Sequence, residues 1–179
     1  MWKPLLRCSI VGGVLVFLWL TLSWTVLPFH KMTFQRFTDE VETESTILSA
    51  APKDGIYVIP YMDQKGEAQT GASKVHPFIF ANIKRGVNFS SMTKSIAFGM
   101  FTQVLGALFI TYFLLKAKIR RYWGRVYFVT LVGFTVAILS ALPAWNWWHF
   151  PCSWIMMSFV DYIVGWFLGG LVIAKLVKD

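Results

Sequence analysis

Hydrophobic residues are gathered into four long runs, which polar stretches separate. The runs cover residues 9–29, 95–115, 126–143 and 153–174 and together contain a single charged residue. Each approaches the length of about 20 apolar residues that a helix needs to cross the hydrocarbon core of a bilayer. The pattern therefore predicts an all-α membrane protein whose four transmembrane helices pack as a bundle.

The polar stretch between the first two runs, residues 30–94, has a pattern of its own. Within residues 33–50 the apolar positions recur at helical spacing, which predicts an amphipathic helix. These positions are Phe34, Phe37, Val41 and Leu48. Residues 56–62 and 77–83 have the composition of short strands and predict a β-hairpin. We expect a small α+β insertion, extracytoplasmic, between the first and second transmembrane helices.

The positions of lysine and arginine predict the orientation of the chain. The loop at residues 116–125 holds five basic residues and no acidic one, which is typical of a cytoplasmic loop. Basic residues also flank the first and last runs, at Lys3, Arg7, Lys175 and Lys178. We therefore expect both termini in the cytoplasm and a Trp-rich outer loop at residues 144–152. The first run predicts an uncleaved signal anchor, because it is long for a signal peptide and lacks a small-x-small cleavage site.

The net charge of +8 does not indicate nucleic-acid binding. The basic residues lie beside the apolar runs, and the segment 30–94 is nearly neutral, with eight Lys/Arg against seven Asp/Glu. The expected partners are the lipid bilayer and either further copies of the chain or a larger membrane complex, with no nucleic acid. Motifs for a nucleophilic serine, a metalloprotease, a phosphate-binding loop or a dinucleotide are absent from the sequence, so we expect no cofactor and favour a non-enzyme.

Asp161 is the one charged residue inside the four runs. It lies about nine residues, or roughly 13 Å, below the outer end of its span. Gln103 and Thr135 lie at similar depth in the second and third spans, and these three residues form a predicted intramembrane polar cluster. Because no span supplies a basic partner, we expect Asp161 to be protonated or bonded to Gln103. Two roles stay open, a packing core and a proton or cation site.

Small residues predict the faces on which these helices pack. Gly165 and Gly169 follow Asp161 at intervals of four residues and share its helical face. Such small-xxx-small faces allow two membrane helices to approach closely. The corresponding residues of the second and third spans are Gly99, Gly106 and Gly133.

A metal site has only weak candidates. His149 and Cys152 are spaced i, i+3, and His30 lies at the same predicted interface, so these side chains could hold a soft metal ion. Pro151 interrupts the helix between the first two, and two-ligand spacing is not specific. We therefore predict no metal.

Three stretches resemble a group of small, uncharacterised bacterial inner-membrane proteins with four transmembrane helices. They are VGGVLVFLWLTLSWTVLPFHK, GIYVIPYM and the tail RVYFVTLVGFTVAILSALPAWNWWHFP…DYIVGWFLGGLVIAKL. The resemblance implies the bacterial inner (plasma) membrane as the compartment and implies no mechanism. The expected function is that of a non-enzymatic accessory, scaffold or interaction subunit. The alternative is a small oligomeric transporter or proton/cation-coupled channel that uses Asp161, and an enzyme acting on lipid or quinone has the least support.

Overall fold

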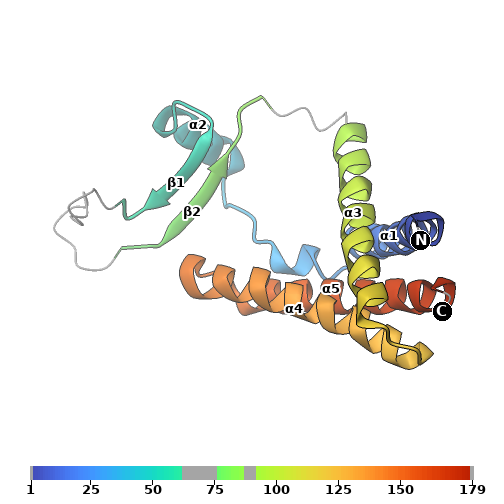
Figure 1. Ribbon diagram of the computed structural model, residues 1–179. Coiled ribbons are helices and arrows are strands. Elements are labelled where there is room, and N and C mark those ends of the chain that lie inside the picture. Colours follow the sequence, from blue (N-terminus) through green and yellow to red (C-terminus); the bar gives the residue numbers. More distant parts are fainter. Residues whose placement is uncertain (1, 62–75, 87–91, 178–179) are drawn as a thin grey trace. The chain divides into compact units, whose positions relative to one another are not determined.

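The computed structural model describes residues 2–61, 76–86 and 92–177, and the chain divides into two units (Figure 1). Residues Met1–Phe34 and Ser91–Asp179 form the membrane unit, and residues Gln35–Ser90 form the insertion unit. The two units are described separately below.

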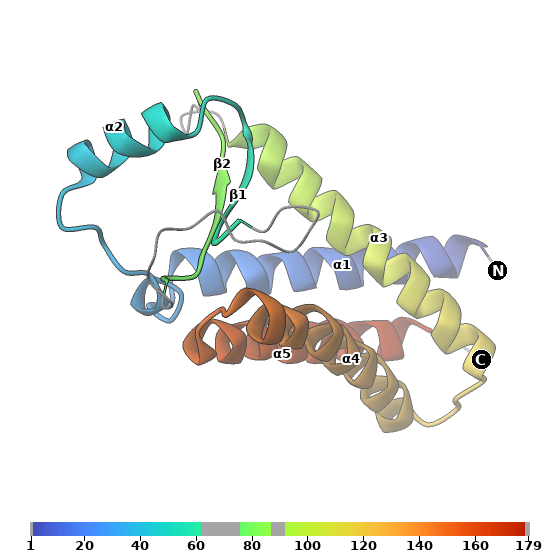
Figure 2. The same ribbon diagram turned by 90° about the vertical axis from the view of Figure 1, so that its left-hand side faces the viewer.

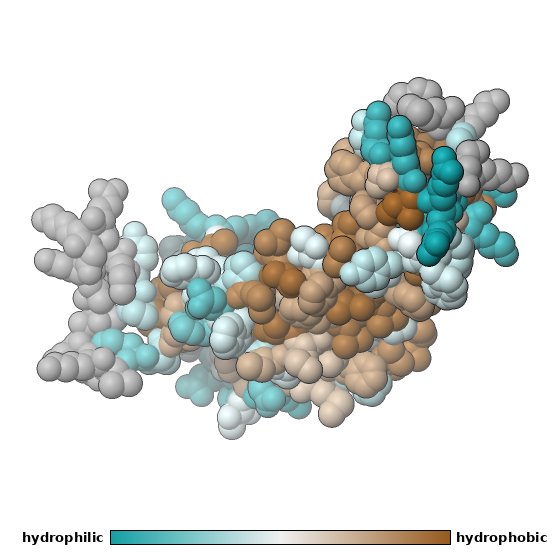
Figure 3. Space-filling model, turned by 60° about the horizontal axis from the view of Figure 1, so that its bottom comes forward, coloured by the Kyte–Doolittle hydropathy of each residue, from teal (hydrophilic) through white to brown (hydrophobic). Residues whose placement is uncertain are grey.

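The membrane unit contains four helices that are long and apolar enough to span a bilayer, as the sequence predicts. These are α1 (Trp2–Thr25), α3 (Thr93–Ala117), α4 (Tyr122–Trp148) and α5 (Cys152–Leu176). A short 3-10 helix, η1 (Lys31–Thr33), follows α1. Large hydrophobic side chains on the outer faces of the long helices are exposed, and Figure 3 shows a broad hydrophobic surface on one side of the molecule. Lipid is the natural cover for such a surface.

Two helix boundaries differ from the predicted ones. Helix α1 ends at Thr25, before the predicted limit of residue 29. Helix α4 continues through Pro143 to Trp148, so the three tryptophans lie on its last turns and the predicted outer loop at 144–152 shrinks to a short turn. Apolar surroundings favour this continuation, because the remaining backbone groups keep their hydrogen bonds inside the helix. The turn begins at His149, which has a positive φ of 53°.

The helices pack in the order α3, α1, α5, α4, and α3 touches α4 only sparsely. Both ribbon views show α3 inclined across α1, while α4 runs beside α5 (Figures 1 and 2). The start of α4 meets the end of α5, where Arg125 donates from Nη1 to the carbonyl of Val177 at 2.6 Å. The same guanidinium donates from Nε to the carbonyl of Ile119 at 2.7 Å. Arg125 therefore ties the C-terminal ends of α3 and α5 together.

Glycines mark the closest helix contacts. A Cβ added at Gly169 would lie 2.8 Å from Val16 of α1, and one at Gly133 would lie 2.5 Å from Trp166 of α5. At Gly13 the nearest atoms are backbone, with the Cα of Val104 at 2.5 Å. The predicted glycines at 133, 165 and 169 are buried, whereas those at 99 and 106 are half-buried. Gly12, Gly13 and Gly170 are close contacts that the sequence analysis did not single out.

The insertion unit consists of helix α2 (Glu40–Ala50) and strands β1 (Gly55–Ile59) and β2 (Ile79–Ile83). The strands form an antiparallel hairpin in which Gly55 is opposite Ile83 and Ile59 is opposite Ile79. The helix starts later than the predicted residue 33, because the Asp39 carboxylate accepts a hydrogen bond from the backbone N–H of Glu42 at 2.9 Å and so caps it.

Polar contacts join the helix of this unit to its hairpin. Arg85, after β2, donates from Nη2 to the carbonyl of Ala51 at 2.7 Å and also to that of Leu48, at the C-terminal end of α2. Lys84 donates to the side chain of Asp54, and the backbone N–H of Arg85 donates to the same carboxylate at 3.0 Å. These bonds, chiefly the one from Lys84, hold the pKa of Asp54 below its usual value.

A pair of glycine substitutions tests the α1–α3 contact. Gly13→Ala should lower the free energy of unfolding by about 1–3 kcal/mol, because the new methyl group meets a backbone that cannot move aside alone. Gly99→Ala is the matched control, since its Cβ would lie 3.5 Å from Phe17, an ordinary contact. Thermal unfolding of the purified variants in detergent measures both effects. Equal stability of the two variants would contradict the close α1–α3 approach.

Candidate functional site

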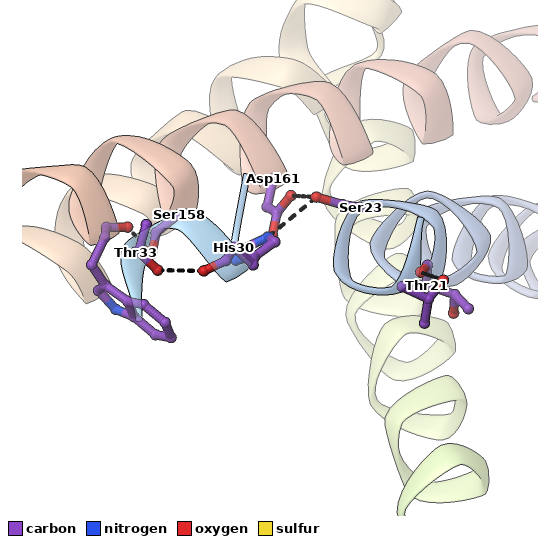
Figure 4. A network of polar contacts seen from close by, with 8 residues as sticks. Thr21, Ser23, His30, Thr33, Ser158 and Asp161 are labelled. Carbon is purple, nitrogen blue, oxygen red and sulfur yellow. Dashed lines mark hydrogen bonds and ion pairs between the residues drawn. The ribbon is translucent and has the colours of Figure 1, made fainter. Parts of the chain in front are cut away.

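Asp161 is buried on α5 and contacts two side chains from other elements (Figure 4). Ser23, in the last turns of α1, donates from Oγ to Oδ1 of Asp161 at 2.6 Å. His30, directly before η1, places Nε2 3.0 Å from Oδ2. The exposed fractions are 2% for Ser23, 3% for His30 and 6% for Asp161. We call these three residues the Asp161 cluster.

The hydrogen bonds of the Asp161 cluster favour one arrangement of its protons. Because the Ser23 hydroxyl donates to Asp161, its oxygen can only accept from Nε2 of His30, 3.2 Å away. Nε2 therefore carries a hydrogen that it shares between Ser23 and Asp161. A distance of 2.6 Å between a hydroxyl and a carboxylate oxygen is typical of a charge-assisted bond. The structure thus pairs Asp161 with Ser23 and His30, and not with Gln103, the partner that the sequence analysis expected.

This geometry is not that of a nucleophilic triad. In such a triad the serine meets one imidazole nitrogen and the carboxylate meets the other, so that the ring can take the proton of the serine. Here Ser23 and Asp161 both meet Nε2 of His30. Nδ1 of His30 is buried and lacks a hydrogen-bond partner among the described residues. The Asp161 cluster therefore cannot activate Ser23 in the usual way.

Aromatic rings and η1 hold His30 in place. The ring of Trp24 stacks on the imidazole with a centroid distance of 3.9 Å and an interplanar angle of 13°. Trp154 of α5 lies edge-on to the same imidazole, and Phe34 packs against Trp154 at 5.8 Å. The hydroxyl of Thr33 donates to the carbonyl of His30 at 2.7 Å. These contacts fix the position of the imidazole beside Asp161.

The structure does not bring together all members of the predicted polar cluster. Gln103 lines a cavity beside Asp161, without a hydrogen bond to that carboxylate. Thr135 is exposed on α4, and its hydroxyl donates to the carbonyl of Leu131 at 2.9 Å. The partners of Asp161 are instead Ser23 and His30. A search for a histidine near the outer end of the first span could have suggested the second of these, because it is the side chain there that best pairs with a buried acid.

The three weak metal candidates lie in different settings. His30 belongs to the Asp161 cluster, His149 ends α4, and Cys152 is exposed at the start of α5. Among the residues that the structure describes, no group of three His, Cys, Asp or Glu side chains is placed to hold a metal ion.

A cavity of about 330 Å³ adjoins the Asp161 cluster. All four long helices contribute to its wall, and aromatic, small and polar side chains line it. The lining residues are Leu20, Trp24, His30, Gln103, Ser140, Ala141, Ala144, Trp154, Ser158, Asp161 and Tyr162. The most buried charge of the membrane spans therefore borders a space that a small molecule could enter.

Comparisons with protein-family models, with curated proteins and with solved structures give no match to this chain. The arguments for function therefore rest on the residues and their geometry.

Removing His30 tests whether the Asp161 cluster is a true charge pair. His30→Ala should lower the free energy of unfolding by about 3 kcal/mol, because it leaves a buried carboxylate with one donor fewer. Adding Asp161→Leu to His30→Ala should restore part of that loss, since the double variant contains no uncompensated charge. Unfolding in detergent of wild type, both single variants and the double variant measures the coupling. Additive effects of the two substitutions would show that the side chains do not interact.

Proposed function

We propose that this chain is a non-enzymatic accessory, scaffold or interaction subunit of a membrane complex, and that its insertion unit meets the partner. The observation that carries the proposal is the exposure of apolar residues in this unit. Helix α2 has no buried residue, and the exposed fractions are 80% for Val41 and 62% for Phe37. Val41 lies on α2 and Phe37 precedes it, and exposed apolar side chains of this kind are typical of a surface that another molecule covers.

The Asp161 cluster supports a scaffold role. Through His30 it holds the segment that leaves α1 against α5, immediately before the insertion unit begins at Gln35. Phe34 continues this contact by packing on Trp154. The start of the segment that leads to the insertion unit is thus fixed to the membrane helices.

Substitutions on two faces of α2 test this proposal. Val41→Asp should abolish association with the partner, because a carboxylate would have to be buried in an apolar contact. Thr46→Asp is the matched control, since it adds the same charge on the opposite face of the helix. Photo-crosslinking in membranes and the native size of the detergent-solubilised complex report the association. The proposal fails if wild type has the size of a monomer, or if both variants keep the larger size.

We also propose that the protein resides in the bacterial inner membrane with both termini in the cytoplasm. The basic loop between α3 and α4 supports this orientation, and Arg125 and Val177 lie at the same end of the bundle as that loop. The bacterial compartment rests on the sequence resemblance alone.

Thiol labelling tests the orientation. Cys152 is exposed and should react with a membrane-impermeant maleimide in intact cells. Cys8 cannot report on the cytoplasmic side, because it is only 1% exposed. An Arg120→Cys, Cys152→Ser variant provides the inner reporter and should react only after the cells are permeabilised. The opposite pattern would reverse the proposed topology.

A second candidate function is that of a small oligomeric transporter or proton/cation-coupled channel. The cavity favours it, because Asp161 forms part of the wall. Four helices are few for a complete pathway, so this role would require several copies of the chain. Asp161→Asn distinguishes the two candidates, since an amide cannot titrate yet keeps the size of the side chain. A scaffold would lose function in this variant only as far as its association with the partner is lost, whereas a proton-coupled transporter would lose transport even where association is intact.

A further inference from the structure

We propose that the cavity beside Asp161 binds a small organic cation, namely a protonated amine with a short apolar group. This inference is independent of both candidate functions above, because it concerns binding and requires neither a partner protein nor transport. Three features of the described side chains carry it: the size and position of the cavity, a group of hydrogen-bond acceptors in its wall, and a buried carboxylate among aromatic rings.

The size and position of the cavity suit a small molecule. Its volume of about 330 Å³ is at the lower end of ligand sites in proteins. Gln103 of α3 and Ala141 of α4 both line the cavity, and these two helices touch only sparsely. Figure 2 shows α3 inclined away from the line of α4 and α5. An amphipathic molecule dissolved at the membrane surface could therefore enter between α3 and α4.

Ser140, Ser158 and Asp161 present hydrogen-bond acceptors to the cavity wall. The hydroxyl of Ser140 donates to the carbonyl of Val136 at 2.7 Å, and that of Ser158 donates to the carbonyl of Trp154 at 3.0 Å. Their hydrogens are thus engaged within their own helices, and only oxygen lone pairs are left for a ligand. Asp161 accepts one bond at each carboxylate oxygen and keeps lone pairs on both. A ligand that donates several hydrogen bonds would match this wall.

The charge of the ligand distinguishes among molecules that donate hydrogen bonds. Asp161 supplies the acidic group of the wall, its hydrogen-bond partners are Ser23 and His30, and no lysine or arginine is among the described residues that line the cavity. Trp24, Trp154 and Tyr162 also belong to the wall, and the faces of aromatic rings attract cations. An ammonium group satisfies both the carboxylate and the rings, whereas an anion would be repelled. The geometry therefore selects a protonated amine over a neutral alcohol of the same shape.

Titration of the wild-type protein with matched ligands tests the proposal. The full-length chain in detergent is titrated at pH 7 with benzylammonium, benzyl alcohol and benzoate, and heat release is measured by calorimetry. We expect benzylammonium to bind at least about tenfold more tightly than benzyl alcohol, and benzoate not to bind, because a charge-assisted bond is formed only with the amine. Equal binding of the amine and the alcohol would overturn the proposal.

Substitutions test whether the amine binds at Asp161. Asp161→Asn should weaken benzylammonium binding at least about tenfold and leave benzyl alcohol binding unchanged. Thr135→Ala is the control, because Thr135 is exposed on α4 and does not line the cavity. Size-exclusion chromatography establishes that each variant is folded, and the comparison of ligands on wild type stands even if one is not. Undiminished amine binding by folded Asp161→Asn would overturn the proposal, as would full displacement of the amine by an equal concentration of sodium.

Discussion

A carboxyl group inside a bilayer must find its hydrogen-bond partners within the protein, and much of this structure follows from that requirement. Asp161 lies on α5, and its own helix offers no donor because the backbone N–H groups are already used. The donors come from Ser23 in α1 and His30 beyond it. The segment after α1 is therefore held against α5 by His30 and Phe34. The insertion unit begins directly after this segment, at Gln35.

Close packing of α1 on α5 is what brings the donors within reach. Val16 lies over Gly165 and Gly169, where any larger residue would push the two helices apart. Asp161 lies one turn further along the same face of α5, so the contact that seats Val16 also aligns Ser23 with the carboxylate. The small residues and Asp161 thus both contribute to the packing of α1 on α5. The glycines permit the approach, and the Asp161 cluster fixes the register of the two helices.

Composition and periodicity of the sequence predict the secondary-structure elements and their small-residue faces. They do not predict which side chains of different helices meet, because that depends on how the helices are inclined and rotated. Four spans, the hairpin and the small-residue faces can be read from the order of residues. The pairing of Asp161 with Gln103 was inferred from equal depth, but α3 is inclined across the bundle, so equal distance along two helices does not place two side chains together. The predicted place of Thr135 in the polar cluster is missed for a related reason. The depth of a residue along a helix does not determine which face of the helix it lies on. His30 was overlooked as a partner because it lies beyond the end of α1, outside the span as hydropathy defines it.

The Asp161 cluster holds two helices together and still leaves hydrogen-bonding capacity on the carboxylate unused. This unused capacity connects the packing of the bundle with ligand binding. Two donors stabilise the carboxylate, yet a carboxylate has room for about four hydrogen bonds. The serines of the neighbouring wall cannot supply the missing donors, because their hydrogens are bonded to helix carbonyls. The bonds from Ser23 and His30 leave further acceptor capacity on the Asp161 carboxylate, which also borders the cavity. The same residue can for that reason hold α1 to α5 and present a negative surface to a ligand, and the two roles use different lone pairs.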